Sequence, residues 1–128
     1  MLEAEVAKWP DDPRLHSALG IVYASLERSG EAVREGKRAM ELLPVSKDSF
    51  YGLPYEYDMA IIYSIAGDHD RALDQIERLL AIPSWISPAW LRTDPLFNPL
   101  HGNQRFKRIL DEYSVKTSIS EAPSSSFQ

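Results

Sequence analysis

The chain has 128 residues, of which 44% are hydrophobic and 26% charged, and it contains no cysteine. This composition is typical of one globular domain, and the missing cysteine excludes disulfides, thiolate catalysis and cysteine-ligated metal sites; it fits a reducing compartment, so we expect a cytoplasmic protein. The net charge of −5 argues against nucleic acid as a partner, and without an apolar run long enough to cross a bilayer we expect no membrane association.

A first pair of helices is predicted over residues 13–44. Gly20 precedes Tyr23 by three residues, and Ala32 follows Tyr23 by nine, across a turn at residues 29–30. Because glycine and alanine have the smallest side chains, Gly20 facing Ala32 would let two antiparallel helices approach closely.

A second pair is predicted over residues 53–83, because the same pattern recurs. Ala60, Tyr63 and Ala72 all follow their counterparts at one constant offset, with a turn at residues 67–68. A fixed offset of this kind indicates an internal repeat, and repeats of this length are built from small units that stack on one another.

This pattern of Leu-Gly, Tyr, Ala and a closing proline, at Pro44 and Pro83, resembles the tetratricopeptide repeat. Residues 66–73 give the closest single match, whereas His16 and Glu56 stand where the family usually has tryptophan. The resemblance implies an all-α fold, an α-α superhelix of antiparallel helix pairs, and a role in protein binding.

The family's usual period is about 34 residues, whereas the two units here are about 40 residues apart, which implies about six extra residues between them. We expect the extra residues in a loop at residues 45–53, because residues typical of loops gather there: Ser46, Lys47, Asp48, Ser49 and Gly52, with Pro54 directly after them. Upstream, Pro10 precedes Pro44 by one usual period of the family, which predicts that residues 1–10 are the end of a still earlier repeat and that the chain begins inside a solenoid.

A capping segment is predicted over residues 84–113. Ser87 and Asp94 each stand before a proline and predict the starts of two short helices, and Asn103 predicts the start of a third. Large apolar side chains of this segment are expected to cover the open end of the second pair: Trp85, Trp90, Leu96, Phe97 and Phe106.

The capping segment also resembles the region that closes tetratricopeptide repeats in bacterial multidomain signalling and regulatory proteins. That resemblance implies that the chain derives from a larger regulator. Residues 114–128, in which Ser, Thr, Pro and Glu dominate, are expected to form a disordered tail.

No arrangement of residues in the sequence predicts catalysis. His69 lies between Asp68 and Asp70, but Asp68 is expected to cap a helix and His69 to be a surface turn residue. His16 and His101 fall on other elements, so no ligand cluster is expected. We therefore expect no enzyme activity, no metal and no cofactor, with a small hydrolase or metal protein as the least favoured alternative.

The remaining hypothesis is binding of a peptide or a partner domain. In tetratricopeptide proteins the first helix of each unit lines a concave surface, which here implies a site formed by Arg14, Ser17, Ile21, Ser25, Tyr57, Asp58, Ile61, Ser64 and Ile65. Ser17, Ile21 and Asp58 occupy positions where the family's carboxylate clamp needs lysine or asparagine, so a chaperone's terminal carboxylate is not the expected ligand.

Self-association without a specific peptide ligand is the alternative, weighed equally. A helix at residues 1–10 without its own partner would leave an apolar edge, which predicts a symmetric homodimer through the amino-terminal edge. The residues expected on that edge are Leu2, Val6, Leu15, Leu19 and Val22.

Overall fold

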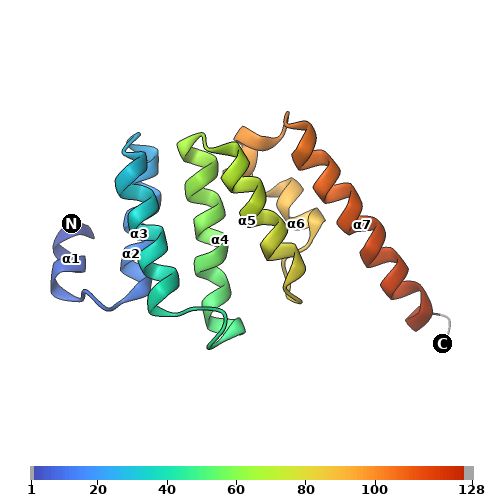
Figure 1. Cartoon of the computed structure of the whole chain (residues 1–128), viewed down its shortest axis with the longest axis horizontal. Helices are drawn as coiled ribbons and strands as arrows, with labels where there is room; N and C mark the ends of the chain where they lie inside the picture. Colours follow the sequence, from blue (N-terminus) through green and yellow to red (C-terminus); the bar gives the residue numbers. More distant parts are fainter. Residues whose placement is uncertain (1, 126–128) are drawn as a thin grey trace.

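The computed structural model describes the backbone of residues 2–125 and, except at 49 and 115–125, their side chains. Every regular element in this range is a helix, as predicted for an all-α chain, and the helices follow one another along the long axis of the molecule (Figure 1). In chain order they are α1 (Leu2–Lys8), α2 (Pro13–Ser25), α3 (Ser29–Leu42), α4 (Ser49–Ala66), α5 (His69–Ala81), α6 (Pro88–Thr93), the 3-10 helix η1 (Pro95–Leu100) and α7 (Gln104–Ser125).

Short turns join α2 to α3 and α4 to α5, and the helices of each pair lie side by side (Figure 1). The second turn is where the sequence predicted it: Gly67 has a left-handed backbone (φ 84°), and the Asp68 side chain caps α5 by accepting from the Arg71 amide at 3.3 Å. The predicted position of the first turn is wrong, because α3 already begins at Ser29 and the left-handed residue is Glu27 (φ 62°).

The predicted close contact within the first pair is confirmed. A Cβ atom placed on Gly20 would lie 3.1 Å from the Ala32 carbonyl oxygen, 3.3 Å from the Gly36 nitrogen and 2.7 Å from Ile62 Cδ1. The absent side chain therefore lets α2 approach both α3 and α4. In the second pair, Ala60 and Ala72 are fully buried.

Helix α4 is the central element, in contact with α2, α3, α5 and η1. Its Met59 and Ile62 are fully buried. A Cβ atom placed on Gly36 of α3 would lie only 2.7 Å from Met59 Sδ and 2.8 Å from Ile62 Cδ1, so the missing side chain lets α3 pack closely on α4. The apolar core thus continues from the first pair into the second rather than forming two separate cores.

The loop predicted at 45–53 is confirmed for residues 45–48 only, and residues 49–53 lengthen α4 instead. Asp48 caps the helix by accepting from the amides of Phe50 and Tyr51, each at 3.0 Å, so the helix starts at Ser49 and includes Pro54. Pro54 removes one hydrogen bond of the helix, but the cap and the packing around it hold the turn. Gly52 lets the helix lie close to the preceding chain: a Cβ atom placed on Gly52 would be only 2.9 Å from the Leu43 carbonyl oxygen.

The capping segment is confirmed for some of its residues and corrected for others. Ser87, Asp94 and Asn103 cap α6, η1 and α7 as predicted, accepting from the amides of residues 90, 96 and 106. Phe97 and Phe106 are buried, together with Leu91 and Leu100, which the sequence did not single out. Trp85, Trp90 and Leu96 are largely exposed instead, although Trp85 and Trp90 contact the buried Tyr57.

Helix α7 continues through Ser125, although the sequence predicted a disordered tail from residue 114. Residues 126–128 of that tail lie outside the described part of the chain. Extending an existing helix fixes one residue for each hydrogen bond gained, which is easier than starting a helix. None of the helices, over the described residues, has both the length and the hydropathy needed to cross a membrane.

Candidate partner-binding site

The nine residues predicted to line a binding surface divide into three groups by burial. Arg14 and Ser25 are exposed, and Ile21, Asp58 and Ile65 are half-buried. The remaining four are buried inside the chain: Ser17, Tyr57, Ile61 and Ser64. The prediction is corrected for these four, because the helices pack directly on one another: α4 is in contact with α2 and also with η1, whose Phe97 meets Tyr57.

Ser17 and Asp58 join α2 to α4. The Ser17 hydroxyl donates to Asp58 Oδ2 at 2.7 Å. Burial raises the pKa of the Asp58 carboxyl, and the hydrogen bond from Ser17 partly opposes that change. These two residues therefore act in holding the helix pairs together.

Tyr57 belongs to an aromatic cluster where α4 meets the capping segment, formed by Tyr57, Trp85, Trp90 and Asp94. The Trp90 indole Nε1 donates to the Tyr57 hydroxyl at 3.0 Å, and that hydroxyl donates to the Asp94 carboxylate. The rings of Trp85 and Trp90 meet edge to face with centroids 5.2 Å apart. The ring centroid of Tyr57 lies 5.9 Å from that of Trp85. Such pairs stabilise one another beyond their buried area.

The local chain fixes the geometry of this cluster. Pro88 and Leu91, three residues apart, place the buried face of α6 against the core, so Trp90 projects to the side. Asp94 has two roles, because its Oδ1 accepts from the Leu96 amide at 2.9 Å while its other oxygen accepts from Tyr57. Burial, and then the hydrogen bond to Asp94, raises the pKa of the Tyr57 hydroxyl, so it remains a donor at neutral pH.

Both indoles of the cluster are half open to solvent. Trp85 is 55% exposed and Trp90 49%. The Nε1–H of Trp90 is already satisfied by Tyr57, so what Trp90 offers to solvent is mainly the apolar ring. The sequence could have indicated this arrangement: once Leu91 is assigned to the core, Trp90 beside it must point about 100° away on the helix.

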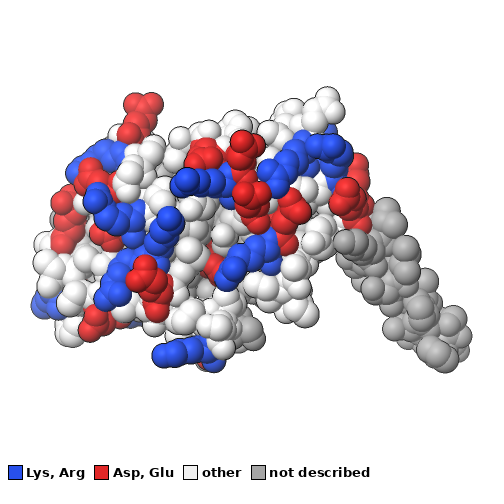
Figure 2. Space-filling view, viewed as in Figure 1, with Lys and Arg blue, Asp and Glu red and all other residues white. Residues whose placement is uncertain are grey.

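Charge is distributed unevenly over the helices. Lysines, arginines and carboxylates crowd the face that presents α3, α5 and the start of α7 (Figure 2). By contrast, α4 contains no lysine or arginine, and α2 and α6 contain one each. Those two cations are paired: Arg14 with Asp12 at 2.8 Å and Arg92 with Asp111 of α7 at 2.9 Å.

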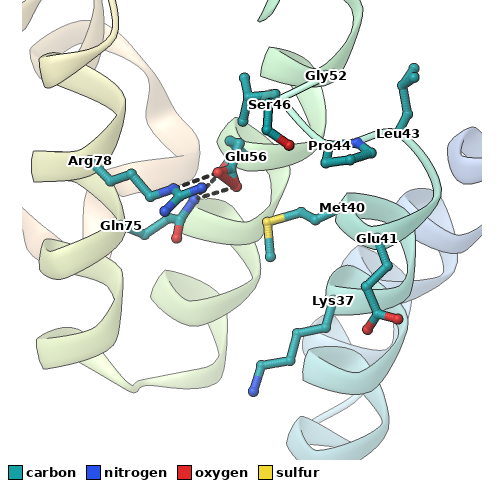
Figure 3. A pocket seen from close by; sticks show the side chains of 11 residues that line it. Lys37, Met40, Glu41, Leu43, Pro44, Ser46, Gly52, Glu56, Gln75 and Arg78 are labelled. Atoms are coloured by element: carbon teal, nitrogen blue, oxygen red, sulfur yellow. Dashed lines mark hydrogen bonds and ion pairs between the residues drawn. The ribbon is translucent and has the colours of Figure 1, made fainter. Parts of the chain in front are cut away.

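A pocket of about 440 Å³ lies between α3 and α5, above α4. Figure 3 shows Arg78 and Gln75 pointing from α5 toward the Glu56 carboxylate on α4, while Met40 extends into the space from α3. Glu56 is buried, with Oε1 2.5 Å from Arg78 Nε and Oε2 3.2 Å from Gln75 Nε2. These bonds compensate a buried charge and join α4 to α5, which is a structural role.

The three histidines fall on different parts of the fold. His16 is buried, with Nδ1 2.5 Å from Glu35 Oε2 and Nε2 2.7 Å from the Pro10 carbonyl oxygen, a structural role that its sequence position did not reveal. His69 begins α5, and His101 stacks on Phe106. Within the described residues, no three His, Asp or Glu side chains gather in a way that could hold a metal ion.

Comparison of the chain with protein-family models, with curated proteins and with solved structures gives no match. Any functional interpretation therefore depends on the geometry described above and on the resemblances seen in the sequence.

Proposed function

We propose that this chain is a protein-interaction module of the tetratricopeptide type, which binds a peptide or a partner domain on the surface that carries the aromatic cluster. Two helix pairs with small residues at their contacts support the repeat interpretation, as does the glycine-aspartate turn before α5. A role in a bacterial signalling or regulatory protein is part of the proposal, and its support is the resemblance of the capping segment.

The observation that carries the proposal is the half-exposure of two adjacent tryptophans on a rigid support. Tryptophan is the residue type most enriched among side chains that dominate binding energies, and exposed apolar patches mark interaction surfaces. Trp85 and Trp90 are held by ring contacts and by the hydrogen bond to Tyr57. A partner would therefore meet an ordered surface that loses little entropy on binding.

A selection from a random peptide display library tests this function. We expect recovered peptides to bind the full chain, and Trp90→Ala to weaken binding about tenfold or more, as for other interface tryptophans. Trp9→Ala is the matched control, because Trp9 is similarly open, 56% exposed, but directly follows α1, far from the cluster along the chain. Failure to enrich any peptide, or equal losses in both variants, would contradict the proposal.

Self-association is the second candidate, and it is favoured by exposed apolar residues near the amino-terminal end. Val22 of α2 and Leu26, which directly follows that helix, are exposed, whereas Leu2 and Val6 are partly buried against the core. If this edge forms a homodimer, sedimentation at tens of micromolar will show it, and Val22→Asp combined with Leu26→Asp will weaken it. A monomer at that concentration would exclude this candidate.

A further inference from the structure

The exposed tryptophan rings of the aromatic cluster are suited to binding a cation. Indole faces are rich in π-electron density and bind cations better than the rings of tyrosine or phenylalanine. The chain uses this interaction elsewhere: the Lys8 ammonium lies 6.0 Å from the Trp9 ring centre, and the Arg28 guanidinium lies 4.5 Å from that of Tyr23. Within the described residues, no lysine or arginine is stacked in this way on Trp85 or Trp90.

The surroundings of the two rings are acidic rather than basic. Asp94 is part of the cluster and only half-buried, and its carboxylate can accept further hydrogen bonds beyond those from Tyr57 and Leu96. The single cation of α6, Arg92, is directed away from the cluster toward Asp111 and Ser114 of α7. Helix α4, which supplies Tyr57, contains no basic residue.

From these observations we propose that the partner is a basic peptide segment, which places a lysine or arginine side chain on the faces of Trp85 and Trp90 beside the Asp94 carboxylate. This inference rests on the proposed function and specifies its partner. The cation would gain ring and carboxylate contacts at once, without competing with a cation of the chain itself. An acidic segment would instead meet Asp94 and the overall charge of −5.

Three peptide libraries test the partner's chemistry. They are identical except for one fixed central residue: arginine, its neutral analogue citrulline, or glutamate. We expect the arginine library to bind the full chain about five- to tenfold more tightly than the citrulline library, as for a partly desolvated cation on an indole, and the glutamate library to bind weakest. The difference between arginine and citrulline should shrink as salt is raised from about 50 to about 500 mM.

Asp94→Asn gives a second, independent measurement. Asparagine keeps one oxygen that can cap η1, but its amide nitrogen cannot accept from the Tyr57 hydroxyl as the second carboxylate oxygen does, and the charge is removed. We expect this variant to lose most of its preference for arginine over citrulline, and the ratio of its two affinities, rather than either affinity alone, is the quantity to compare with the wild type. Asp70→Asn, an exposed carboxylate at the start of α5, is the control and should keep that preference.

The outcomes separate the two proposals. Equal binding of the arginine and citrulline libraries, with Trp90→Ala weakening both, would overturn the basic partner and leave the interaction function in place. Absence of binding by all three libraries and by the random display library would overturn both.

Discussion

At the scale of single residues, the two turns between paired helices solve the same problem with different side chains. Gly67 adopts its left-handed backbone freely, whereas Glu27 adopts a similar one at a cost, because its Cβ crowds the backbone there. We expect Glu27→Gly to stabilise the fold by up to about 1 kcal/mol, and Gly67→Ala to destabilise it by about 1 kcal/mol. Urea denaturation of both variants measures these changes. If the free energy of unfolding changed in the same direction in both variants, the prediction would be contradicted.

Asp58 makes stability depend on pH. Burial raises its pKa in the folded chain above the ordinary 3.8, so the unfolded chain loses its proton first as the pH rises. The free energy of unfolding should therefore fall as the pH rises from about 3.8 through the raised pKa of Asp58 in the folded chain. Below pH 3.8, Asp58 should have no effect on it. Because Asp58→Asn can still accept from Ser17, we expect the variant to lack this fall and to be more stable than the wild type at neutral pH.

The midpoint of urea denaturation, followed between pH 3 and pH 7, measures the effect of Asp58. Asp70→Asn serves as the control, since that carboxylate is exposed. Parallel pH profiles for the wild type and Asp58→Asn would show that the burial of Asp58 does not influence folding.

What the sequence predicts about residues depends on whether the relevant neighbour is close in the chain. The spacing of Gly20 and Ala32 predicted their contact, because both lie in one helix pair. The burial of Tyr57 and Ile61 could not be read in this way, since it depends on how α4 meets α2 and η1, which both lie far from these residues along the chain. Residues of the candidate site were misassigned for the same reason.

At the scale of helices, the contact at Gly20 is sensitive to substitution. Gly20→Leu must displace Ile62 and the α3 backbone, which should cost about 1–3 kcal/mol or more and lower the melting temperature by several degrees. Gly30→Ala is the control, because a Cβ there meets nothing within 4 Å and alanine favours the helix by about 0.5–1 kcal/mol. An unchanged melting temperature for Gly20→Leu would contradict the close contact.

Helix starts were predictable where a capping side chain and a proline stand together, as at Ser87 and Asp94. The start of α4 was missed because its cap, Asp48, is followed by a glycine and a proline that both favour a loop. Those local preferences are overcome by packing: Gly52 fits closely against residues 43–45, and Leu53 is buried. Local chemistry alone does not contain that contact.

At the scale of the whole molecule, the capping segment should be required for folding. Phe97 and Leu100 of η1 are fully buried, and η1 is in contact with α4. We expect removal of residues 84–128 to expose the surface of α4 that η1 covers. The shortened chain should then aggregate or lose its helical circular dichroism signal. Removal of residues 116–128 alone should leave the signal of the remaining helices and the melting temperature nearly unchanged.

The central position of α4 has a consequence for how the chain comes apart. In a long solenoid each unit contacts only its neighbours, so end units can open while the middle stays folded. Here one helix contacts both members of the first pair, its own partner and the capping segment, so none of these can leave without exposing it. The backbone amides of α4 should therefore exchange with deuterium only when the entire chain unfolds, whereas those of α1, which has no buried residue, should exchange through local fraying.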